Sequence, residues 1–347
     1  MIDWISGTLP FSHRHVVGEG FHIDMDRNGD VKRQILKRRE ITGSFETGIN
    51  VRTDLGSERD DGTYSHLKFD GNPVKLFQGH NLWGSNDLHG LVRELYIFLL
   101  TAIDGTIPNL DDRRMVDMGG VQLTRVDIND SYQLDSLRDV LAWIRAAENS
   151  VRLKHRGRGE MKGSTLYFGK HSTRWAVKIY AKGQEVRDHG MDKQPGIFGL
   201  PHCMEYADRA LRPELVLRGP ELKKRGLDLA GNWADNTAEE LHRELLQKLE
   251  FAEAMTITPD VIDDLPGSLR GAYALWKEGH DLRQVYSRPT FYRYRSKLLA
   301  HGIDISIKQE ARPDNVVPLV RILEAKPVGV PDWAIGTNLY FEPRKFG

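Results

Sequence analysis

Apolar and polar residues alternate along several stretches of the first 220 residues, which is the pattern of strands with one buried face. Within Arg174–Tyr180, Trp175, Val177 and Ile179 fall on one face, and Lys178 falls on the other. The same alternation or β-branched enrichment predicts further strands at Ile2–Pro10, several between Val31 and Phe69, one from Val74 into the turn Gly79-His80-Asn81, Val121–Tyr132, Thr165–Phe168 and Leu211–Arg218.

Apolar residues at helical spacing predict helices between these strands. Leu88–Ala102 is the clearest, with Asn86 or Asp87 placed to cap its first turn. The others are Leu134–Ala147, Leu200–Ala210 and Thr237–Ala254. This mixture predicts an α+β fold with a central antiparallel sheet and helices on one face.

The last third of the chain carries helical patterns alone. Ser268–Glu278, Leu282–Tyr286 and Thr290–Ala300 are separated by a Gly-His turn and a Pro break, which is typical of a helix-turn-helix unit. Helical hairpins of this kind also occur in proteins that bind no DNA. We therefore predict two domains, 1–255 and 256–347, the second helical.

Composition narrows the class of protein. The formal net charge is zero, so any contact with nucleic acid must come from local basic patches. The single cysteine, Cys203, excludes an internal disulfide and a cysteine-based zinc site, and it suits the cytoplasm. The first residues show no signal-peptide pattern, and the longest apolar run, near Leu95–Ile103, is too short to span a bilayer. We expect a cytoplasmic protein with no membrane partner.

The hairpin formed by the Thr165–Phe168 and Arg174–Tyr180 strands ends in a group of polar side chains. Tyr180, Lys182 and Glu185 lie close together in the sequence. A phenol is a weak nucleophile near its unperturbed pKa of about 10, and a nearby cation or metal favours the phenolate. Tyr180 is therefore a candidate nucleophile, although a tyrosine at a strand end more often has only a packing role.

Two other strands place charged side chains among apolar neighbours. Arg125, Asp127 and Asn129 share one face of the Val121–Tyr132 strand, and Glu214 lies on the Leu211–Arg218 strand. Such groups destabilise a strand unless they are paired or bind a ligand. For Asp127, a metal-binding or phosphate-handling role and a structural pair with Arg125 remain equally open. His80, in a turn, is either a metal or phosphate contact or a structural residue.

Basic residues gather in two places. The first is the loop before the hairpin, with Arg152, Lys154, Arg156, Arg158 and, inside the hairpin, Lys170. The second is the helical unit near the C-terminus, with Arg283, Arg288, Tyr292, Arg293 and Arg295. Most such groups are only solvated. Beside a candidate nucleophile, however, they are predicted to contact DNA phosphates, as are Arg125 and Asn81.

Several separated segments together resemble the replication initiators of filamentous bacteriophages, the gene II/X family. They are MIDWISGTLPF at the start, LFQGHNLWGSNDL at Leu76–Leu88, LTRVDINDS at Leu123–Ser131, Thr165–Glu185 and Leu211–Arg218. These segments occur in order over roughly residues 1–220. The hairpin also resembles that of plasmid rolling-circle replication proteins. The family's covalent tyrosine lies in a Tyr-x-Lys-x-x-Glu pattern, which this chain matches at Tyr180, Lys182 and Glu185.

The resemblance implies a ferredoxin-like core and a site-specific nicking-joining endonuclease. Tyr180 would form a 5′-phosphotyrosyl bond, with Lys182 stabilising charge or protonation. Because the chain lacks the His-hydrophobic-His pair of the wider superfamily, the expected Mg²⁺ or Mn²⁺ would rest on Asp127, Glu214, Glu185 and His80, in falling order.

The partners implied are the phage origin, as duplex and single strand, and the host helicase and polymerase. Two alternatives stay open: a non-catalytic origin-binding protein, and a metal-dependent nuclease that uses water. Tyr292 and Tyr294 are reserve nucleophiles.

Overall fold

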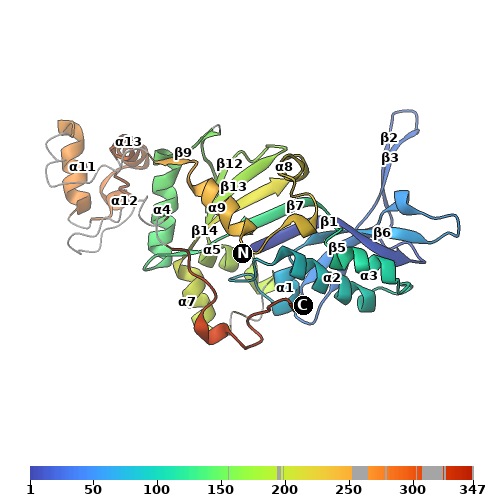
Figure 1. The fold of residues 1–347 in the computed structure, drawn as a ribbon. Helices are drawn as coiled ribbons and strands as arrows, with labels where there is room; N and C mark the ends of the chain where they lie inside the picture. Colours follow the sequence, from blue (N-terminus) through green and yellow to red (C-terminus); the bar gives the residue numbers. More distant parts are fainter. Residues whose placement is uncertain are drawn as a thin grey trace.

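The structure is a computed structural model that describes residues 1–347 apart from 155, 194–196, 198, 252–264, 278–279, 302, 307–322, 324–325 and 346–347. Its centre is an antiparallel sheet with the strand order β11-β12-β13-β14-β7-β1-β6-β5-β4, to which β8 adds beside β14 (Figure 1). The strands are β1 (Ile2–His13), β4 (Arg39–Thr42), β5 (Gly48–Thr53), β6 (Tyr64–Gly71), β7 (Gln122–Asn129), β8 (Tyr132–Gln133), β11 (Glu160–Lys162), β12 (Thr165–Phe168), β13 (Trp175–Ala181) and β14 (Ala210–Arg218).

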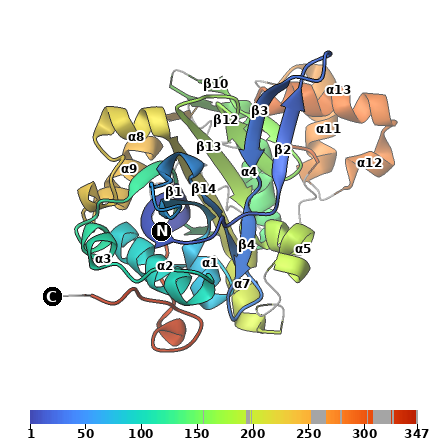
Figure 2. The same ribbon diagram turned by 90° about the vertical axis from the view of Figure 1, so that its right-hand side faces the viewer.

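Alternation along these strands gives the sheet one apolar face and one polar face. The apolar face, represented by Ile5, Val126 and Leu215, belongs to a single large core. The helices that pack on this core include α2 (Leu88–Ala102), α3 (Leu110–Asp117), α4 (Leu137–Ser150), α8 (Gly219–Arg225) and α9 (Thr237–Leu246). Figure 2 shows α2, α3, α8 and α9 together on one side of the sheet. The predicted α+β fold with helices on one face is confirmed.

The polar face is the less covered side. Reading across it by strand register, Lys178 lies opposite Glu214, Glu214 opposite Asn129, and Arg218 opposite Arg125. Charged side chains can line these strands because a face without a layer of core helices does not have to be apolar. In Figure 2, the β2–β3 hairpin and helices α5 (Lys182–Lys193), α11, α12 and α13 lie toward this other side.

One end of the sheet is closed by a smaller apolar cluster. It joins α5, α7 (Pro201–Arg209), the loop at Leu82-Trp83 and the C-terminal segment through Ala334. The C-terminal segment, red in Figure 1, runs past α7 back toward α1. There Arg344 forms an ion pair with Glu94, with Nε 2.7 Å from Oε1. A short 3-10 helix, η3 (Asp332–Ala334), lies in this segment.

The C-terminal helices have a core of their own. They are α11 (Gly267–Lys277), α12 (Leu282–Val285) and α13 (Arg288–Leu299), packed around Leu269, Tyr273, Leu282 and Phe291. The predicted boundary at 255/256 lies outside the described residues. Because 326–345 contact the first domain, the separate helical core covers 265–305 and not the whole of 256–347.

A two-stranded hairpin, β2 (Phe21–Met25) with β3 (Val31–Leu36), projects from the end of the molecule opposite the C-terminal helices (Figure 1). Its apolar residues Phe21, Ile23 and Met25 are exposed. No described helix has the length and apolar character that crossing a bilayer requires.

Three local predictions were wrong. The predicted strand from Val74 is a helix, α1 (Pro73–Gln78), because Asn72 caps its N-terminus, Pro73 fits its first turn and Gly79 ends it at φ 81°. A side chain at Gly79 would also meet Phe45. Pro10 does not end β1, which continues past it through a bulge to His13.

The helix predicted over Thr237–Ala254 ends at Leu246 and is followed by β15 (Leu249–Phe251). The predicted basic loop contributes β9 (Val151–Leu153) and β10 (Gly157–Arg158), which pair in a small sheet of order β10-β9-β15. Tertiary pairing decides both cases, because short strands carry too little local pattern to be recognised. Two further 3-10 turns are η1 (Leu55–Ser57) and η2 (Ala230–Asn232).

Candidate active site

Two carboxylates lie together in the middle of the polar face. Asp127 on β7 and Glu214 on β14 are 2% and 4% exposed. Lys178 on β13 donates to Glu214 Oε1 at 2.5 Å and lies 3.9 Å from Asp127 Oδ2. Arg125 binds Asp127 with both arms, at 2.8 and 2.5 Å. Two carboxylates and two cations thus form one network at the centre of three adjacent strands.

The electrostatics of this pair follow from burial and from the neighbouring charges. Burial raises the pKa of Asp127 to about 7, helped by the charge of Glu214 and opposed by Arg125. Burial also acts to raise the pKa of Glu214, but the Lys178 ammonium outweighs it and the pKa is lowered. Near neutral pH the pair therefore holds a proton that is easily released.

Asn129, directly opposite Glu214 in the register, adds a third oxygen. Its side chain is fully buried, and neither Oδ1 nor Nδ2 has a hydrogen-bond partner in the described part of the chain. Buried amides are normally satisfied, so this one requires an explanation such as an absent ion or water. Oxygen donors from Asp127, Glu214 and Asn129 fit the preference of Mg²⁺ or Mn²⁺.

The other two predicted ligands lie apart from this pair. Glu185 accepts a hydrogen bond from Lys182 at 2.6 Å. His80 Nδ1 lies 3.3 Å from Gln78 Nε2 and from the Leu82 amide, both of which donate, so the ring proton belongs on Nε2. Burial lowers the pKa of His80 to about 3. Among the described residues, no three His, Cys, Asp or Glu side chains gather as a metal site.

Tyr180, the predicted nucleophile, lies at the closed end of the same polar face. It is 6% exposed and lies opposite Arg212 on β14. Burial raises the pKa of Tyr180 well above its usual value, the charge of Glu214 adds to the rise, and Arg212 opposes it. In this conformation the residue is a protonated phenol beside a buried guanidinium.

A loop closes over this end of the face. Arg212 donates to the carbonyl of Asn81 at 2.6 Å and also to that of Leu82. Lys182, fully buried, donates to Asn81 Oδ1 at 2.7 Å, and Asn81 Nδ2 donates to Asp3 Oδ1 at 2.8 Å. Burial lowers the pKa of Lys182. Asn81, predicted to contact DNA, instead has both ends of its amide engaged inside the protein.

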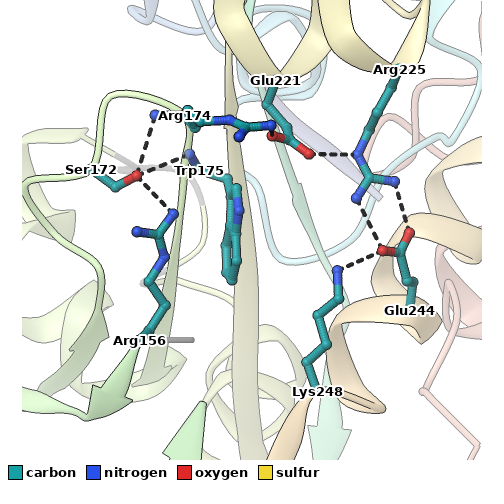
Figure 3. A network of polar contacts seen from close by, with 8 residues as sticks. All are labelled: Arg156, Ser172, Arg174, Trp175, Glu221, Arg225, Glu244 and Lys248. Atoms are coloured by element: carbon teal, nitrogen blue, oxygen red, sulfur yellow. Dashed lines mark hydrogen bonds and ion pairs between the residues drawn. The ribbon is translucent and has the colours of Figure 1, made fainter. Parts of the chain in front are cut away.

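The basic residues near the hairpin divide into exposed and engaged groups. Arg152, Lys154 and Arg158 are exposed. Arg156 donates to Ser172 Oγ at 2.9 Å, and its guanidinium lies 4.5 Å from the centroid of the Trp175 ring (Figure 3). Lys170 is half-buried, 3.7 Å from Glu160.

A charged network borders this surface on the other side of Trp175. Figure 3 shows Arg174 and Arg225 directed at Glu221, and Arg225 and Lys248 directed at Glu244. Lys248, between α9 and β15, has its Nζ 5.6 Å from the Trp175 ring centroid. These pairs fix the base of the hairpin against α8 and α9.

On the C-terminal helices, Arg283, Arg288, Tyr292 and Arg293 are exposed. Arg295 is different, because Asp304 holds it with two hydrogen bonds of 2.9 and 3.0 Å. The prediction of DNA contact through this surface therefore keeps four open side chains and one that is already paired.

Sequence reasoning did not select Lys178, Arg212 or Asn129. The signal for Lys178 was its place on the same strand face as Tyr180, and Asn129 shares a face with Asp127. Arg212 gave no signal of its own, because only the register Tyr180–Arg212 brings these two residues together.

Comparison with known proteins gives concordant matches. Residues 1–236 match the N-terminal family, and residues 257–340 the C-terminal family, of the replication-associated protein that is the gene II product of filamentous phages. The chain is 39% identical over 338 residues to the replication-associated protein of Enterobacteria phage I2-2, covering 95% of each chain. It is also similar to the structure of a rolling circle replication initiator protein from Geobacillus stearothermophilus, with 14% identity, 74% and 88% of the two chains covered and a TM-score of 0.31.

Two family matches in chain order and a relative that is similar from end to end establish the family. This chain belongs to the gene II family of replication-associated proteins, the rolling-circle replication initiators of filamentous bacteriophages.

Proposed function

We propose that this initiator nicks one strand of the phage origin with Tyr180 as nucleophile, and later rejoins it. The supporting observation is the arrangement of one polar sheet face, where Tyr180 with Arg212 lies two residues along the strands from Lys178 with Glu214. A tyrosine, two cations and a carboxylate pair on adjacent rigid strands can hold a phosphodiester in a fixed position.

In the proposed reaction, the Tyr180 oxygen forms a bond to the scissile phosphorus and the bond to the 3′ oxygen breaks. The phenolic proton leaves Tyr180, and the departing 3′ oxygen gains one. Lys182, whose pKa burial lowers, is placed to stabilise charge or carry a proton beside this reaction. Because the phosphotyrosyl bond keeps the energy of the phosphodiester, attack by a 3′-OH can reseal the strand without ATP.

A divalent cation, when bound, would polarise the phosphate and neutralise its charge. Asp127 and Glu214 are the residues that would hold it, with the Asn129 oxygen as a third donor. Lys178 and Arg125 occupy these carboxylates here, so they neutralise the pair and would have to shift toward the phosphate when the ion binds.

Tyr180 must also become accessible, since it is 6% exposed. The loop that covers it is held by Arg212 and Lys182, both of which carry positive charge toward the place where a phosphate would enter. An entering phosphate offers these cations a stronger partner than a carbonyl or an amide. We therefore propose that the origin strand opens this end of the face as it binds.

The exposed basic residues at the hairpin and on the C-terminal helices would contact the duplex origin and set the position of the cut. Host helicase and polymerase remain proposed partners in the cytoplasm of the bacterial host. The described chain supplies no observation on either.

The test is nicking of a supercoiled plasmid that carries the phage's own origin, with Mg²⁺ or Mn²⁺, followed by mass spectrometry of the digested protein. A nucleotide-bearing Tyr180 peptide is expected, and it should vanish in Tyr180→Phe. Tyr167→Phe is the matched control, because Tyr167 is a half-buried tyrosine on the neighbouring strand of the same face. An adduct on Tyr292 or Tyr294 would place the active site in the other domain, and nicking without an adduct would indicate water as nucleophile.

A further inference from the structure

Two arginines face each other across the polar face without an anion between them. Arg218, the last residue of β14, lies directly opposite Arg125 on β7. Like charges placed directly opposite on adjacent strands destabilise a sheet. Arg125 is compensated by Asp127, but among the described residues Arg218 has no such partner.

The unsatisfied group can be located to an atom. Nη1 of Arg218 is buried and has no hydrogen-bond partner, and within the described part of the chain its side chain forms no ion pair. Burial lowers the pKa of Arg218, and the charge of Arg125 adds to the effect. A guanidinium held in this way, half-buried and beside a second guanidinium, costs folding free energy that a bound anion would recover.

The surroundings indicate which anion. A groove of about 840 Å³ begins next to Arg218, at Gly219, and is lined among others by Thr8, Lys68, Gln122, Thr124 and Lys223. Its wall is polar, and Lys223 is exposed. On the opposite side, Arg125 lies 5.5 Å from the centroid of the half-buried Trp4 ring. Cations along a groove with an aromatic ring beside them are features of single-stranded nucleic-acid sites.

We propose that Arg218, together with Arg125, binds a non-scissile phosphate of the nicked single strand, and that the strand continues from there into the Lys68–Lys223 groove. The planar fork of each guanidinium suits two phosphate oxygens. By register, the order along the strands is Tyr180, then Glu214, then Asp127 beside Val216, then the Arg218–Arg125 pair. The second phosphate is thus held on the far side of the carboxylates from the nucleophile. This inference deepens the proposed function and rests on it.

The experiment measures binding of a single-stranded origin oligonucleotide by anisotropy over a series of salt concentrations, in the Tyr180→Phe background so that no covalent product forms. Arg218→Met should lower the slope of log K against log salt by about 0.7, the amount expected for one phosphate on a single strand. Lys224→Met is the matched control, because Lys224 is exposed on α8 but does not line the groove, and its slope should not change.

A methylphosphonate placed at each linkage in turn then locates the contact. One neutral linkage away from the cut should weaken binding to the protein that retains Arg218, and should have no further effect on Arg218→Met. Equal sensitivity of both proteins at every linkage would overturn the proposal.

Thermal unfolding without DNA separates this role from a structural one. Arg218→Met should leave the Tm unchanged or raise it, because it removes one of two opposed charges. A Tm that falls, with the salt slope retained, would show that Arg218 serves the fold and would overturn the proposal. If the salt slope and the methylphosphonate scan behave as expected but no adduct forms on Tyr180, the phosphate subsite stands and the proposed nucleophile fails.

Discussion

Lys178 donates to Glu214 Oε1 at 2.5 Å and so places an ammonium against one of the two carboxylates proposed to hold a metal. The charge on Lys178 lowers the pKa of Glu214, and that of Glu214, against the effect of burial, raises the pKa of Lys178. The lysine therefore takes the place of a divalent cation in this conformation, and two measurable consequences follow for metal binding.

Removing the ammonium should strengthen metal binding. We expect Lys178→Met to bind Mn²⁺ about tenfold more tightly at pH 8, corresponding to about 1.4 kcal/mol, because the cation no longer competes for Glu214. Titration calorimetry checks this. Without metal, the same variant should unfold at lower temperature, since Glu214 and Asp127 then repel each other.

Lys68→Met is the control for this variant, because Lys68 lies on the same face but pairs with Asp54 at 2.8 Å. Weaker Mn²⁺ binding by Lys178→Met would instead mean that the lysine orients the carboxylates and that the ion lies elsewhere.

The affinity for metal should depend on pH through Asp127. Its pKa is raised to about 7, mainly by burial, and a metal binds only the ionised carboxylate. Mn²⁺ affinity should therefore be constant above about pH 8 and fall by up to tenfold for each pH unit below about 7. Asp127→Asn should show weak binding with no such step. A wild-type affinity that does not change between pH 6 and pH 8 contradicts the assignment of Asp127.

The covered state of Tyr180 predicts slow nitration. Tetranitromethane should modify exposed Tyr292 readily and Tyr180 hardly at all, because Tyr180 is buried and its pKa is raised well above the usual value. Asn81→Ala removes the acceptor for Lys182 and the donor to Asp3, so the covering loop should loosen and nitration of Tyr180 should quicken several-fold.

Mass spectrometry of the Tyr180 peptide measures the nitration rate. Asn232→Ala is the control, since it removes a surface amide that donates to the Gly226 carbonyl, away from this loop. If the rates for Tyr180 are equal in the two variants, Asn81 does not hold the loop.

Stability toward acid should depend on Asp130. Burial acts against its ionised form, but a hydrogen bond from His242 and the charge of the N-terminus lower its pKa to about 2. A folded-state pKa below the unfolded value of about 4 means that the stabilisation is complete above pH 4 and is lost as the pH falls through about 2.

Asp130→Asn should lower the free energy of unfolding by about 2 kcal/mol at neutral pH. The difference from wild type should shrink steadily between pH 4 and pH 2 in urea titrations. A difference that stays the same over this range would indicate lost packing and not a lost charge.

The sequence predicted well those features that rest on local pattern. The hairpin of Thr165–Phe168 with the strand ending near Tyr180, the Leu88–Ala102 helix and the C-terminal helices follow from periods of 2 and 3.6 residues, and the structure confirms them. The same period placed Lys178 with Tyr180, and Asp127 with Arg125, on single faces of their strands. The resemblance to the phage initiators was also carried by local segments, which the family matches confirm.

Strand order and register, which the tertiary structure decides, could not be read from the chain. Only the pairing of β14 between β13 and β7 brings Glu214 beside Lys178 and Asn129, and sets Arg218 against Arg125. Burial is likewise a property of the whole fold. It raises the pKa of Asp127 to about 7 and covers Tyr180, although the local sequences give no sign of either. A single strand specifies which face a side chain occupies, but the charges that face it come from strands far away in the sequence.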